Sequence, residues 1–364
     1  MFLKKQEGRK ILENKNEENQ KIFQFSALKN QTVSAVVVTY NRKKLLLECL
    51  EALLKQSRPL NAIYIIDNAS TDDTPEILLE HKYIPKLPPS NIKKPWEVFN
   101  SVANFQKYGT NSNLSVIIYY VRMQENNGAS GGFYEGVKRS YEKGYDWTWL
   151  MDDDGIPSED CLNKLLLGEK KYHADFLAPL VIDIKNSGRL SFGISDYRNK
   201  QTIYNFHDAM KYSINGSFEG TACPYNGILI SKELIKIAGY PKREMFIWGD
   251  ESEYLLRIKS KGFKIITICN AIHKHPIGKI GYHKIFFGQF WVRFNNQKLR
   301  DYCRFRNMAY IYKKYNAYKL LKDITKYTWF FIISRKFDLK NMLFYFSATI
   351  DGLKGDFSKH RNFL

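Results

Sequence analysis

Short apolar runs that end in polar residues alternate with segments of helical periodicity near the start of the chain. Residues 34–42, SAVVVTYNR, are a β-branched run closed by polar residues, which predicts a buried strand. Residues 43–56 place a set of apolar side chains on one helical face, namely Leu46, Cys49, Leu50, Leu53 and Leu54. Residues 62–80 repeat the order with a strand, a polar turn and a helix. This alternation predicts a parallel α/β sheet.

Further strand patterns extend the predicted sheet. They are residues 114–123, 145–154, 174–184, 226–231 and 264–272. A proline-rich segment at 83–96 is interpreted as an excursion between elements. Because ligands gather at the carboxyl ends of parallel strands, we expect Asp67 and the aspartates at 152–154 to share one edge of the sheet.

The pattern divides the chain into three parts. A polar N-terminal arm covers 1–32, an α/β region covers 33–283, and a basic, aromatic tail with helical spacing covers 284–364. The arm has no apolar core and is not a signal peptide. The longest apolar run of the tail, 329–333, is too short to span a bilayer.

The net charge of the chain is high, and most of the excess lies in the tail. The formal net charge is +19, and the tail carries 17 Lys and Arg against 5 Asp and Glu, so 12 of the excess charges lie there. A basic surface of this size indicates an anionic partner: a nucleic acid, an acidic membrane or a phosphorylated substrate. The five cysteines are scattered, which argues against a disulfide framework and fits a reducing cytoplasm.

Three consecutive carboxylates, Asp152, Asp153 and Asp154, directly follow an apolar run. They repel one another at neutral pH unless a cation lies among them. Asp152 and Asp154 can both reach one divalent cation if the backbone turns there, and oxygen ligands suit Mg²⁺ or Mn²⁺ with substrate phosphates. The alternative is a simple turn, since Asp-Gly shortly before a proline ends a strand well.

Two other segments could carry chemistry. NNGASGGFYEG, residues 126–136, has four glycines before a helical stretch, so its amides could meet an anion, or it could be a flexible loop that starts a helix. It matches neither the P-loop nor the dinucleotide-binding pattern. In FIWGDESEYLLRIKSKG, residues 246–262, an acidic residue at the helix start could be a general base or could only favour the helix dipole. The acidic residues are Asp250, Glu251 and Glu253.

Two histidines, His273 and His275, end the last strand pattern of the α/β region. A single histidine there would more often be structural. A histidine near a carboxylate cluster can instead complete a metal site, because imidazole also binds Mn²⁺.

Taken in order, these segments resemble a family-2 glycosyltransferase of the GT-A fold, a nucleotide-sugar-dependent inverting enzyme. The resemblance runs over 33–283 and rests on VVVTYNR, IIDNASTDDT, DDD, and WGDE followed by EYLLR. NNGASGGFYEG and the DDD triplet are most similar to bacterial galactofuranosyltransferases. The tail motifs YCRFRNMAY and DGLKGDF are similar to ends of related galactofuranosyl- and rhamnosyltransferases. The resemblance implies a Rossmann-like, mostly parallel sheet with flanking helices, whose halves 33–157 and 158–283 bind nucleotide and acceptor.

The resemblance also assigns roles to residues. The implied metal ligands for Mn²⁺ or Mg²⁺ are Asp152 and Asp154, with His275 favoured over His273. The implied base is Glu251, with Asp250 as the alternative. The implied acceptor contacts are Trp248 and Glu253. The implied donor contacts, with Asp67 at the uracil, are Thr39, Tyr40, Arg42, Asp67, Asn68, Asn126, Gly128, Gly131, Gly132 and Asp153.

The expected reaction moves galactofuranose from UDP-galactofuranose to a hydroxyl of a lipid-linked glycan by a single metal-assisted displacement. The basic tail would then meet anionic lipids at the inner face of the cytoplasmic membrane, or be a solvated helical cap with an oligomer contact. A rhamnosyltransferase or other hexosyltransferase is the alternative of the same fold. A nucleic-acid-binding protein is the alternative of another class, but the chain has no recognisable nucleic-acid motif, so no nucleic-acid partner is expected.

Overall fold

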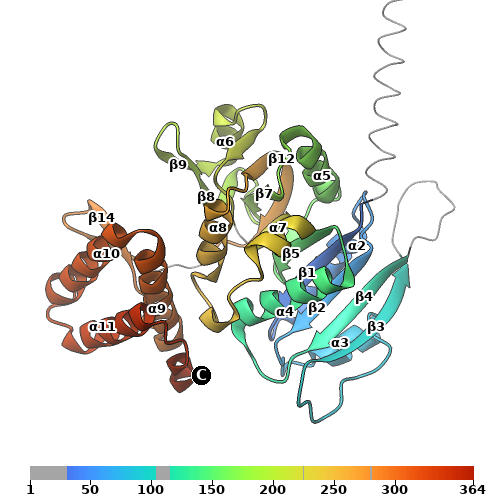
Figure 1. Ribbon diagram of the computed structural model, residues 1–364, viewed down its shortest axis with the longest axis horizontal. Coiled ribbons are helices and arrows are strands. Elements are labelled where there is room, and N and C mark those ends of the chain that lie inside the picture. The colour runs from blue at the N-terminus through green and yellow to red at the C-terminus, as the bar shows by residue number, and fades with distance from the viewer. Residues whose placement is uncertain (1–30, 104–114, 224, 279–280) are drawn as a thin grey trace, which may run out of the picture.

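The computed structural model describes residues 31–103, 115–223, 225–278 and 281–364 (Figure 1). The predicted N-terminal arm lies outside the described residues, apart from its last two positions. The described chain forms an α/β region followed by a helical C-terminal unit, which lies at one end of the molecule (Figure 1).

The α/β region follows the predicted alternation closely in its first half. Its elements there are β1 (Val33–Thr39), α2 (Lys43–Leu54), β2 (Ala62–Asp67), α3 (Thr74–Glu80), β3 (Trp96–Ala103), β4 (Ser115–Arg122), α4 (Gly128–Lys143) and β5 (Trp147–Asp152). The second half contains β6 (Ile156–Pro157), α5 (Cys161–Tyr172), β7 (Phe176–Asp183), β8 (Arg189–Asp196), β9 (Gln201–Asn205), α6 (Phe206–Tyr212), β10 (Ser217–Glu219), β11 (Asn226–Ser231), α7 (Lys232–Ala238), η1 (Arg243–Met245), α8 (Asp250–Ser260) and β12 (Ile265–His275).

The strands form one sheet in the order β10-β12-β7-β11-β5-β1-β2-β4-β3. The block β5-β1-β2-β4 is parallel, as is the pair β7 and β12, whereas β11 runs antiparallel between β5 and β7. The predicted α/β class with a mostly parallel central sheet is therefore confirmed. The antiparallel edge strand β3, which follows the proline-rich segment, was not predicted; among the described residues it pairs with β4.

Helices cover both faces of this sheet, and the two faces have separate apolar cores. In β1, Ala35 and Val37 pack toward α2, whereas Val36 and Val38 pack toward α4. The helix predicted at 43–56 buries the expected side chains, namely Leu46, Cys49, Leu50, Leu53 and Leu54. A strand buried on both faces reads as a continuous apolar run, which explains why β1 was recognisable in the sequence.

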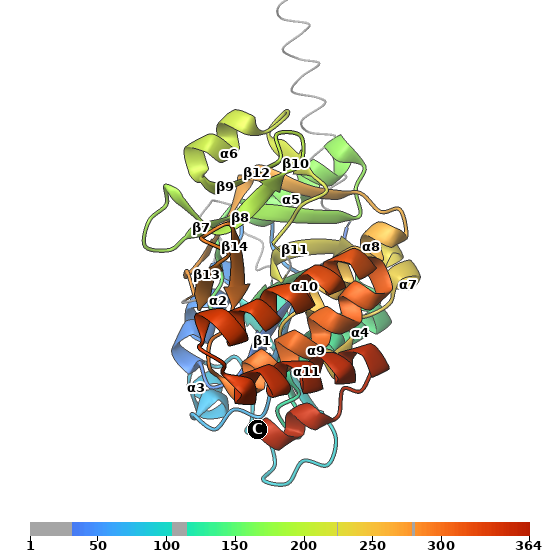
Figure 2. The same ribbon diagram turned by 90° about the vertical axis from the view of Figure 1, so that its left-hand side faces the viewer.

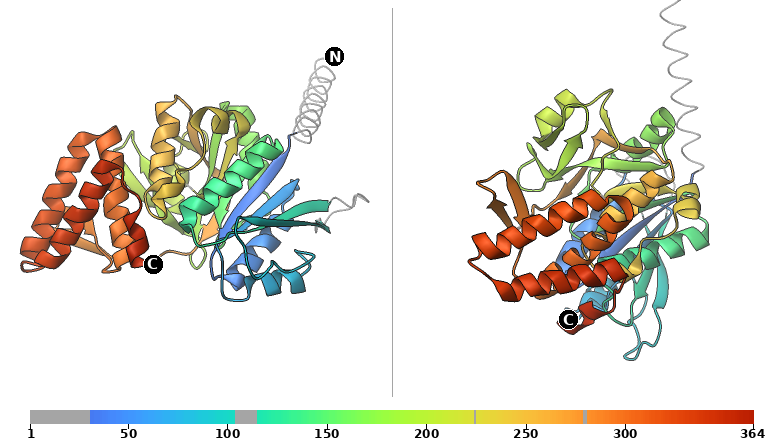
Figure 3. Two further views of the ribbon diagram at one scale, coloured as in Figure 1. Left: turned by 60° about the horizontal axis from the view of Figure 1, so that its bottom comes forward. Right: turned by 60° about the vertical axis from the view of Figure 1, so that its left-hand side comes forward.

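The C-terminal unit is largely helical, as predicted, but it begins with a hairpin that was not predicted (Figures 2 and 3). Its elements are β13 (Tyr282–Ile285), β14 (Phe290–Arg293), α9 (Lys298–Tyr315), α10 (Ala317–Trp329), the π-helical turn η2 (Phe330–Ser334), α11 (Leu339–Lys354) and η3 (Lys359–Phe363). Its core is aromatic: the Tyr345 ring stacks on Tyr327 with a centroid distance of 4.6 Å. In the part of the chain that the structure describes, every helix is too short or too polar to cross a membrane.

Candidate functional site

The carboxyl ends of β1, β2 and β5 lie next to one another at one edge of the sheet. Thr39 at the end of β1 is paired with Asp67 at the end of β2, and Val38 is paired with Asp152 at the end of β5. The prediction that Asp67 and the aspartate triplet share an edge is therefore confirmed.

A cluster of possible metal ligands lies at this edge. One ligand atom from each of Asp152, Asp154 and His275 lies within 4.8 Å of the other two. His275 reaches the aspartates because β12 pairs with β6, which directly follows the triplet, and its Nε2 atom is 3.1 Å from Asp154 Oδ1. Two carboxylates and an imidazole are suitable donors for a divalent cation such as Mn²⁺.

Burial and neighbouring charges shift the pKa values of the two carboxylates in the cluster. Burial, together with the Asp154 charge, raises the pKa of Asp152 to about 7. Burial also acts to raise the pKa of Asp154, but the hydrogen bond and charge of His275 outweigh it and hold that pKa below its ordinary value. A cation bound between the two carboxylates would offset their mutual repulsion and the cost of burying their charges. The residues present therefore fit a divalent metal.

His273 lies outside the cluster. Its side chain is fully buried, and its ring packs so closely against Gly155 and Gly227 that a Cβ atom at either glycine would clash with it. Burial lowers the pKa of His273 to about 3, so the ring is neutral. The structure therefore brings His275, and not His273, to the two aspartates.

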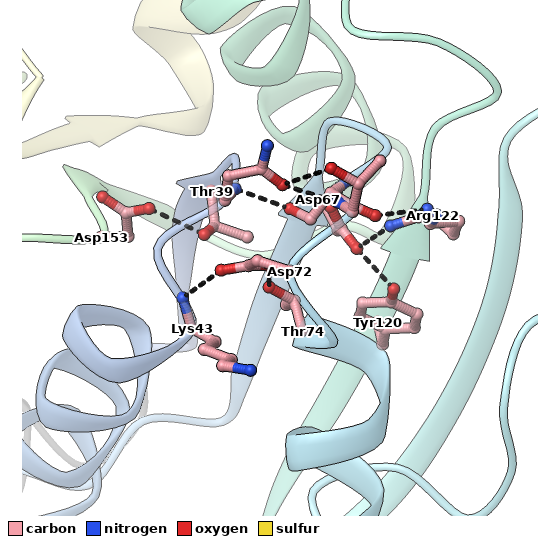
Figure 4. Close-up of polar contacts among 11 residues, drawn as sticks. Thr39, Lys43, Asp67, Asp72, Thr74, Tyr120, Arg122 and Asp153 are labelled. Carbon is pink, nitrogen blue, oxygen red and sulfur yellow. Dashed lines mark hydrogen bonds and ion pairs between the residues drawn. The ribbon is translucent and has the colours of Figure 1, made fainter.

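The middle aspartate, Asp153, is bound to β1 and its following turn. Its Oδ2 atom accepts a hydrogen bond of 2.7 Å from the Thr39 hydroxyl (Figure 4). Its Oδ1 atom lies 3.1 Å from Arg42 Nη1. The same nitrogen lies 2.9 Å from Asp154 Oδ2, so Arg42 supplies a positive charge to the cluster. The neighbouring Tyr40 is exposed. Donor contacts by these residues stay predictions.

The Asp67 carboxylate is fully buried and is occupied by protein groups (Figure 4). Its Oδ2 atom accepts hydrogen bonds of 2.6 Å from the Tyr120 hydroxyl and from Arg122 Nη1, and its Oδ1 atom accepts one of 2.8 Å from the Ser70 amide. These contacts give Asp67 a role within the fold, joining β2 to β4. The predicted contact with uracil stays a prediction.

A cavity of about 350 Å³ lies beside this aspartate. Its walls include residues 69–71 after β2, residues 122–124 at the end of β4, and Pro88 and Pro89. The proline-rich segment, interpreted from the sequence only as an excursion, thus lines a pocket at the edge of the sheet. The sequence analysis did not identify Arg122 as a wall of this cavity or as the partner of Asp67. An arginine at the end of an apolar strand gives no local sign of the residue it pairs with.

The glycines do not form a loop before the helix, because α4 begins at Gly128 and includes the whole glycine run. A Cβ atom at Gly132 would overlap Val38, so the lack of a side chain lets the helix approach the sheet closely. Gly128 has a φ of +68° and a carbonyl that accepts a hydrogen bond of 3.0 Å from Asn68 Nδ2. Its amide donates to Asn126 Oδ1 at 2.8 Å. The expected donor contacts of this segment stay predictions, namely those of Asn68, Asn126, Gly128, Gly131 and Gly132.

The three acidic residues near the start of α8 differ in their surroundings. Asp250 is buried, and burial together with the Glu251 charge raises its pKa well above the ordinary value. Glu251 is half-buried, and its Oε2 atom accepts a hydrogen bond of 3.0 Å from the Gly249 amide. The carboxylate of Glu253 is buried and ion-paired with Arg257 at 2.8 Å, and its predicted acceptor contact stays a prediction.

Trp248 has a partner that the sequence did not reveal. The guanidinium carbon of Arg293, in β14, lies 3.5 Å from the centre of its indole ring. Burial, followed by the charge of Arg304, lowers the pKa of Arg293 to about 10, so the side chain stays a cation. The C-terminal unit therefore places a positive charge on the aromatic residue that was predicted to shape the acceptor site.

The fold and this site define an α/β protein whose strand edge can hold a divalent cation. A family model described as Glycosyl transferase family 2 matches residues 34–94 and 99–226. The chain belongs to glycosyl transferase family 2, and the predicted resemblance and fold class are confirmed.

Relatives share most of the chain. The galactofuranosyltransferase GlfT1 of Mycolicibacterium smegmatis is 25% identical over 311 residues, which cover 84% of this chain and 91% of the relative. GlfT1 of Mycobacterium tuberculosis is 26% identical, with coverage of 84% and 90%. The dTDP-rhamnosyl transferase RfbF of Shigella flexneri is 22% identical over 341 residues, with coverage of 90% and 97%.

Two solved structures are also similar to the chain. GalNAc-T7 with UDP, GalNAc and Mn²⁺ has a TM-score of 0.48 at 14% identity, covering 67% of this chain and 43% of that protein. Residues 1–349 of TarS from S. aureus have a TM-score of 0.46 at 14% identity, with coverage of 91% and 89%.

Proposed function

We propose that the protein transfers galactofuranose from UDP-galactofuranose to a hydroxyl of a lipid-linked glycan, with inversion at the anomeric carbon. The observation that carries the chemistry is the cluster of Asp152, Asp154 and His275 at the edge where parallel strands end. The choice of sugar is supported by the similarity to galactofuranosyltransferases over 84% of the chain.

The cluster would hold Mn²⁺ or Mg²⁺ through the two carboxylates and the imidazole. When bound, such a cation would neutralise negative charge on the departing nucleoside diphosphate. Arg42, which contacts both Asp153 and Asp154, would keep the triplet in place and reduce the repulsion among its members.

Glu251 is proposed as the base. Its half-buried carboxylate takes the proton from the acceptor hydroxyl while the hydroxyl oxygen bonds to the anomeric carbon, and the bond from that carbon to the diphosphate oxygen breaks. Asp250 is the weaker candidate, because its carboxyl is buried, and burial raises its pKa and so favours the protonated form. Trp248, with Arg293 stacked on it, is proposed to form one wall of the acceptor site.

Two substitutions test this scheme. We expect Glu251→Gln to lower kcat by about 10²–10⁴-fold, because the general base is lost. We expect Asp154→Asn to weaken the binding of Mn²⁺ itself, measured by isothermal titration. Glu233→Gln is the control, because that exposed carboxylate lies in the preceding helix α7 and has no predicted role in the site. Full activity in Glu251→Gln would remove that residue from the scheme.

A rhamnosyltransferase is the second candidate, because RfbF is similar over 90% of this chain. Saturation-transfer NMR with UDP-galactofuranose, UDP-galactopyranose and dTDP-rhamnose, each with and without Mn²⁺, separates the candidates. Preferred binding of the furanose supports the proposal. Preferred binding of dTDP-rhamnose would keep the family and replace the sugar.

The C-terminal unit is proposed to dock on an anionic membrane surface, at the inner face of the cytoplasmic membrane. One face of α11 exposes Leu339, Leu343 and Ile350 at helical spacing, and the exposed Lys354 follows Ile350 by one turn. The excess of 12 positive charges over 284–364 favours anionic lipids, and it disfavours a second copy of the same basic unit as the partner.

Sedimentation with vesicles tests the docking. We expect Leu343→Asp to reduce binding to vesicles that contain phosphatidylglycerol, whereas Ile237→Asp, at an exposed position of α7, leaves binding unchanged. Equal binding of both variants would refute a membrane role for this face. Dimerisation of the wild type that Leu343→Asp abolishes would assign the face to a second copy.

A further inference from the structure

The loop before Glu251 has an unusual backbone. Phe246 has φ 67° and ψ −72°, and the Ile247 amide donates to the Met245 carbonyl at 2.9 Å, which is a γ-turn of the strained type. Trp248 and Gly249 also have positive φ values, of 64° and 94°. Backbone of this kind persists only where surrounding groups hold it in place.

Helix α9 supplies such groups from the C-terminal unit. The Asn307 Nδ2 atom lies 3.0 Å from the carbonyl oxygens of Met245 and Ile247 and 2.6 Å from that of Trp248. Arg306 Nη2 donates to the Met245 carbonyl at 2.8 Å, and Arg306 Nε donates to Asn307 Oδ1 at 2.9 Å. Both side chains are fully buried. The two residues are the central Arg-Asn of the tail motif YCRFRNMAY.

The second tail motif, DGLKGDF, meets the same arginine. A Cβ atom at Gly352 would overlap the Arg306 carbonyl oxygen, so only glycine lets α11 approach α9 here. The Phe357 carbonyl accepts a hydrogen bond of 3.2 Å from Arg306 Nη1. Asp351 accepts one of 2.7 Å from the Tyr302 hydroxyl at the start of the first motif. The two motifs therefore form one packed unit around Arg306.

The loop is also fixed from the side of the sheet. The Ser130 amide, in the first turn of α4, donates to the Phe246 carbonyl at 3.0 Å. Gly128 lies so close to that carbonyl that a Cβ atom would overlap it. The loop thus lies between α4 of the α/β region and α9 of the C-terminal unit, and its position depends on both.

We infer that Arg306 and Asn307 are positioning residues that hold residues 245–249 in their strained conformation and so place Trp248 and Glu251 for the reaction. The inference rests on the proposed role of Glu251 as the base. An amide is required at Asn307 because its nitrogen faces three carbonyl oxygens while its oxygen accepts from Arg306. The C-terminal unit thereby contributes to the active site, in addition to its proposed docking on the membrane.

The expected effect of removing the amide is a loss of kcat without a loss of donor binding. Asn307→Asp places a carboxylate oxygen against carbonyl oxygens, so the loop relaxes and Glu251 moves. A displacement of about 1 Å costs about 100-fold in rate. Binding of UDP with Mn²⁺ is expected to stay unchanged, because the cluster at the strand edge lies on other elements.

The experiment measures UDP released from UDP-galactofuranose with an extracted lipid-linked glycan fraction, together with UDP–Mn²⁺ affinity. Asn307→Asp is compared with Asn316→Ala, which removes the cap of α10 in the same helical unit without touching the loop. If Asn307→Asp does not fold, Asn307→Ser removes the amide without adding charge. A variant at Asn307 that keeps full kcat would overturn the inference.

A double variant separates this inference from the proposed function. If Asn307 acts through Glu251, Asn307→Asp combined with Glu251→Gln loses little more activity than Glu251→Gln alone. Losses that multiply would overturn the inference, because they would mean that Asn307 acts independently of the base. Full activity in Glu251→Gln alone would refute the proposed base instead.

Discussion

Replacement of Asp67 by asparagine tests whether this buried carboxylate serves the fold or the nucleotide. The substitution keeps the shape of the side chain and removes its charge. Arg122, whose side chain is only 17% exposed, then loses its carboxylate partner at 2.6 Å, and the Tyr120 hydroxyl loses its charged acceptor. The amide group of asparagine cannot satisfy all three donors, because an amide oxygen that accepts from Tyr120 and Arg122 leaves the NH2 group facing the Ser70 amide.

The expected loss of unfolding free energy follows from these contacts. Breaking a buried ion pair by removing one partner costs about 3–5 kcal/mol. Arg122 keeps its hydrogen bond of 2.7 Å to the Ser70 carbonyl and some exposure, so we expect the lower end, about 3 kcal/mol. Tyr120→Phe removes a single hydrogen bond and is expected to cost about 1 kcal/mol. Urea unfolding followed by tryptophan fluorescence measures both values.

A double-mutant cycle with Arg122→Met provides the control. If the pair is structural, the double variant is more stable than the sum of the single losses predicts, by about 2 kcal/mol, because no buried cation is left unpaired. UDP affinity is measured on the same proteins. A loss of UDP affinity in Asp67→Asn with almost unchanged stability would refute the structural role and support the uracil contact instead.

Three further predictions concern other parts of the site. Asp250→Asn should stabilise the protein by an amount that grows as the pH rises above about 4, where the carboxyl of the unfolded state ionises. Burial raises the folded pKa of Asp250, so the folded state binds more protons than the unfolded state and wild-type stability falls as the pH rises. A stability difference that does not change with pH would contradict this. Gly132→Ala should cost about 2 kcal/mol of unfolding free energy through overpacking against Val38, as equilibrium unfolding would show, and an unchanged stability would contradict the close approach of α4 to β1. His275→Ala should weaken Mn²⁺ binding at least about ten-fold, whereas His273→Leu should not, and equal losses would disprove the ligand assignment.

Local patterns were enough to place the strand edge that carries the cluster. Burial of β1 on both faces produces an uninterrupted apolar run, and the helical spacing of 43–56 identifies the side chains that α2 buries. Thr39, Asp67 and Asp152 share an edge because parallel strands necessarily end on the same side of their sheet. These features depend only on residues close together in the chain, so the sequence was sufficient for them.

The same local patterns misplaced the glycines at 128–136. Glycine favours loops and disfavours helices when its neighbours in sequence are considered alone. Here the tertiary approach of α4 to β1 decides the outcome, because only a residue without a side chain fits against Val36 and Val38. Packing between elements that are distant in the chain therefore overrides the local preference.

The sequence by itself determined the α/β class, the strand edge with its aspartates and the family resemblance. Only the tertiary structure decided which histidine joins the aspartates, that Arg293 stacks on Trp248, and that Asn307 holds the loop before Glu251. Those pairings join side chains that lie far apart in the chain, and no spacing in the sequence encodes them. The depth at which a charged group is buried, which separates Asp250 from its neighbour, likewise depends on how whole elements pack.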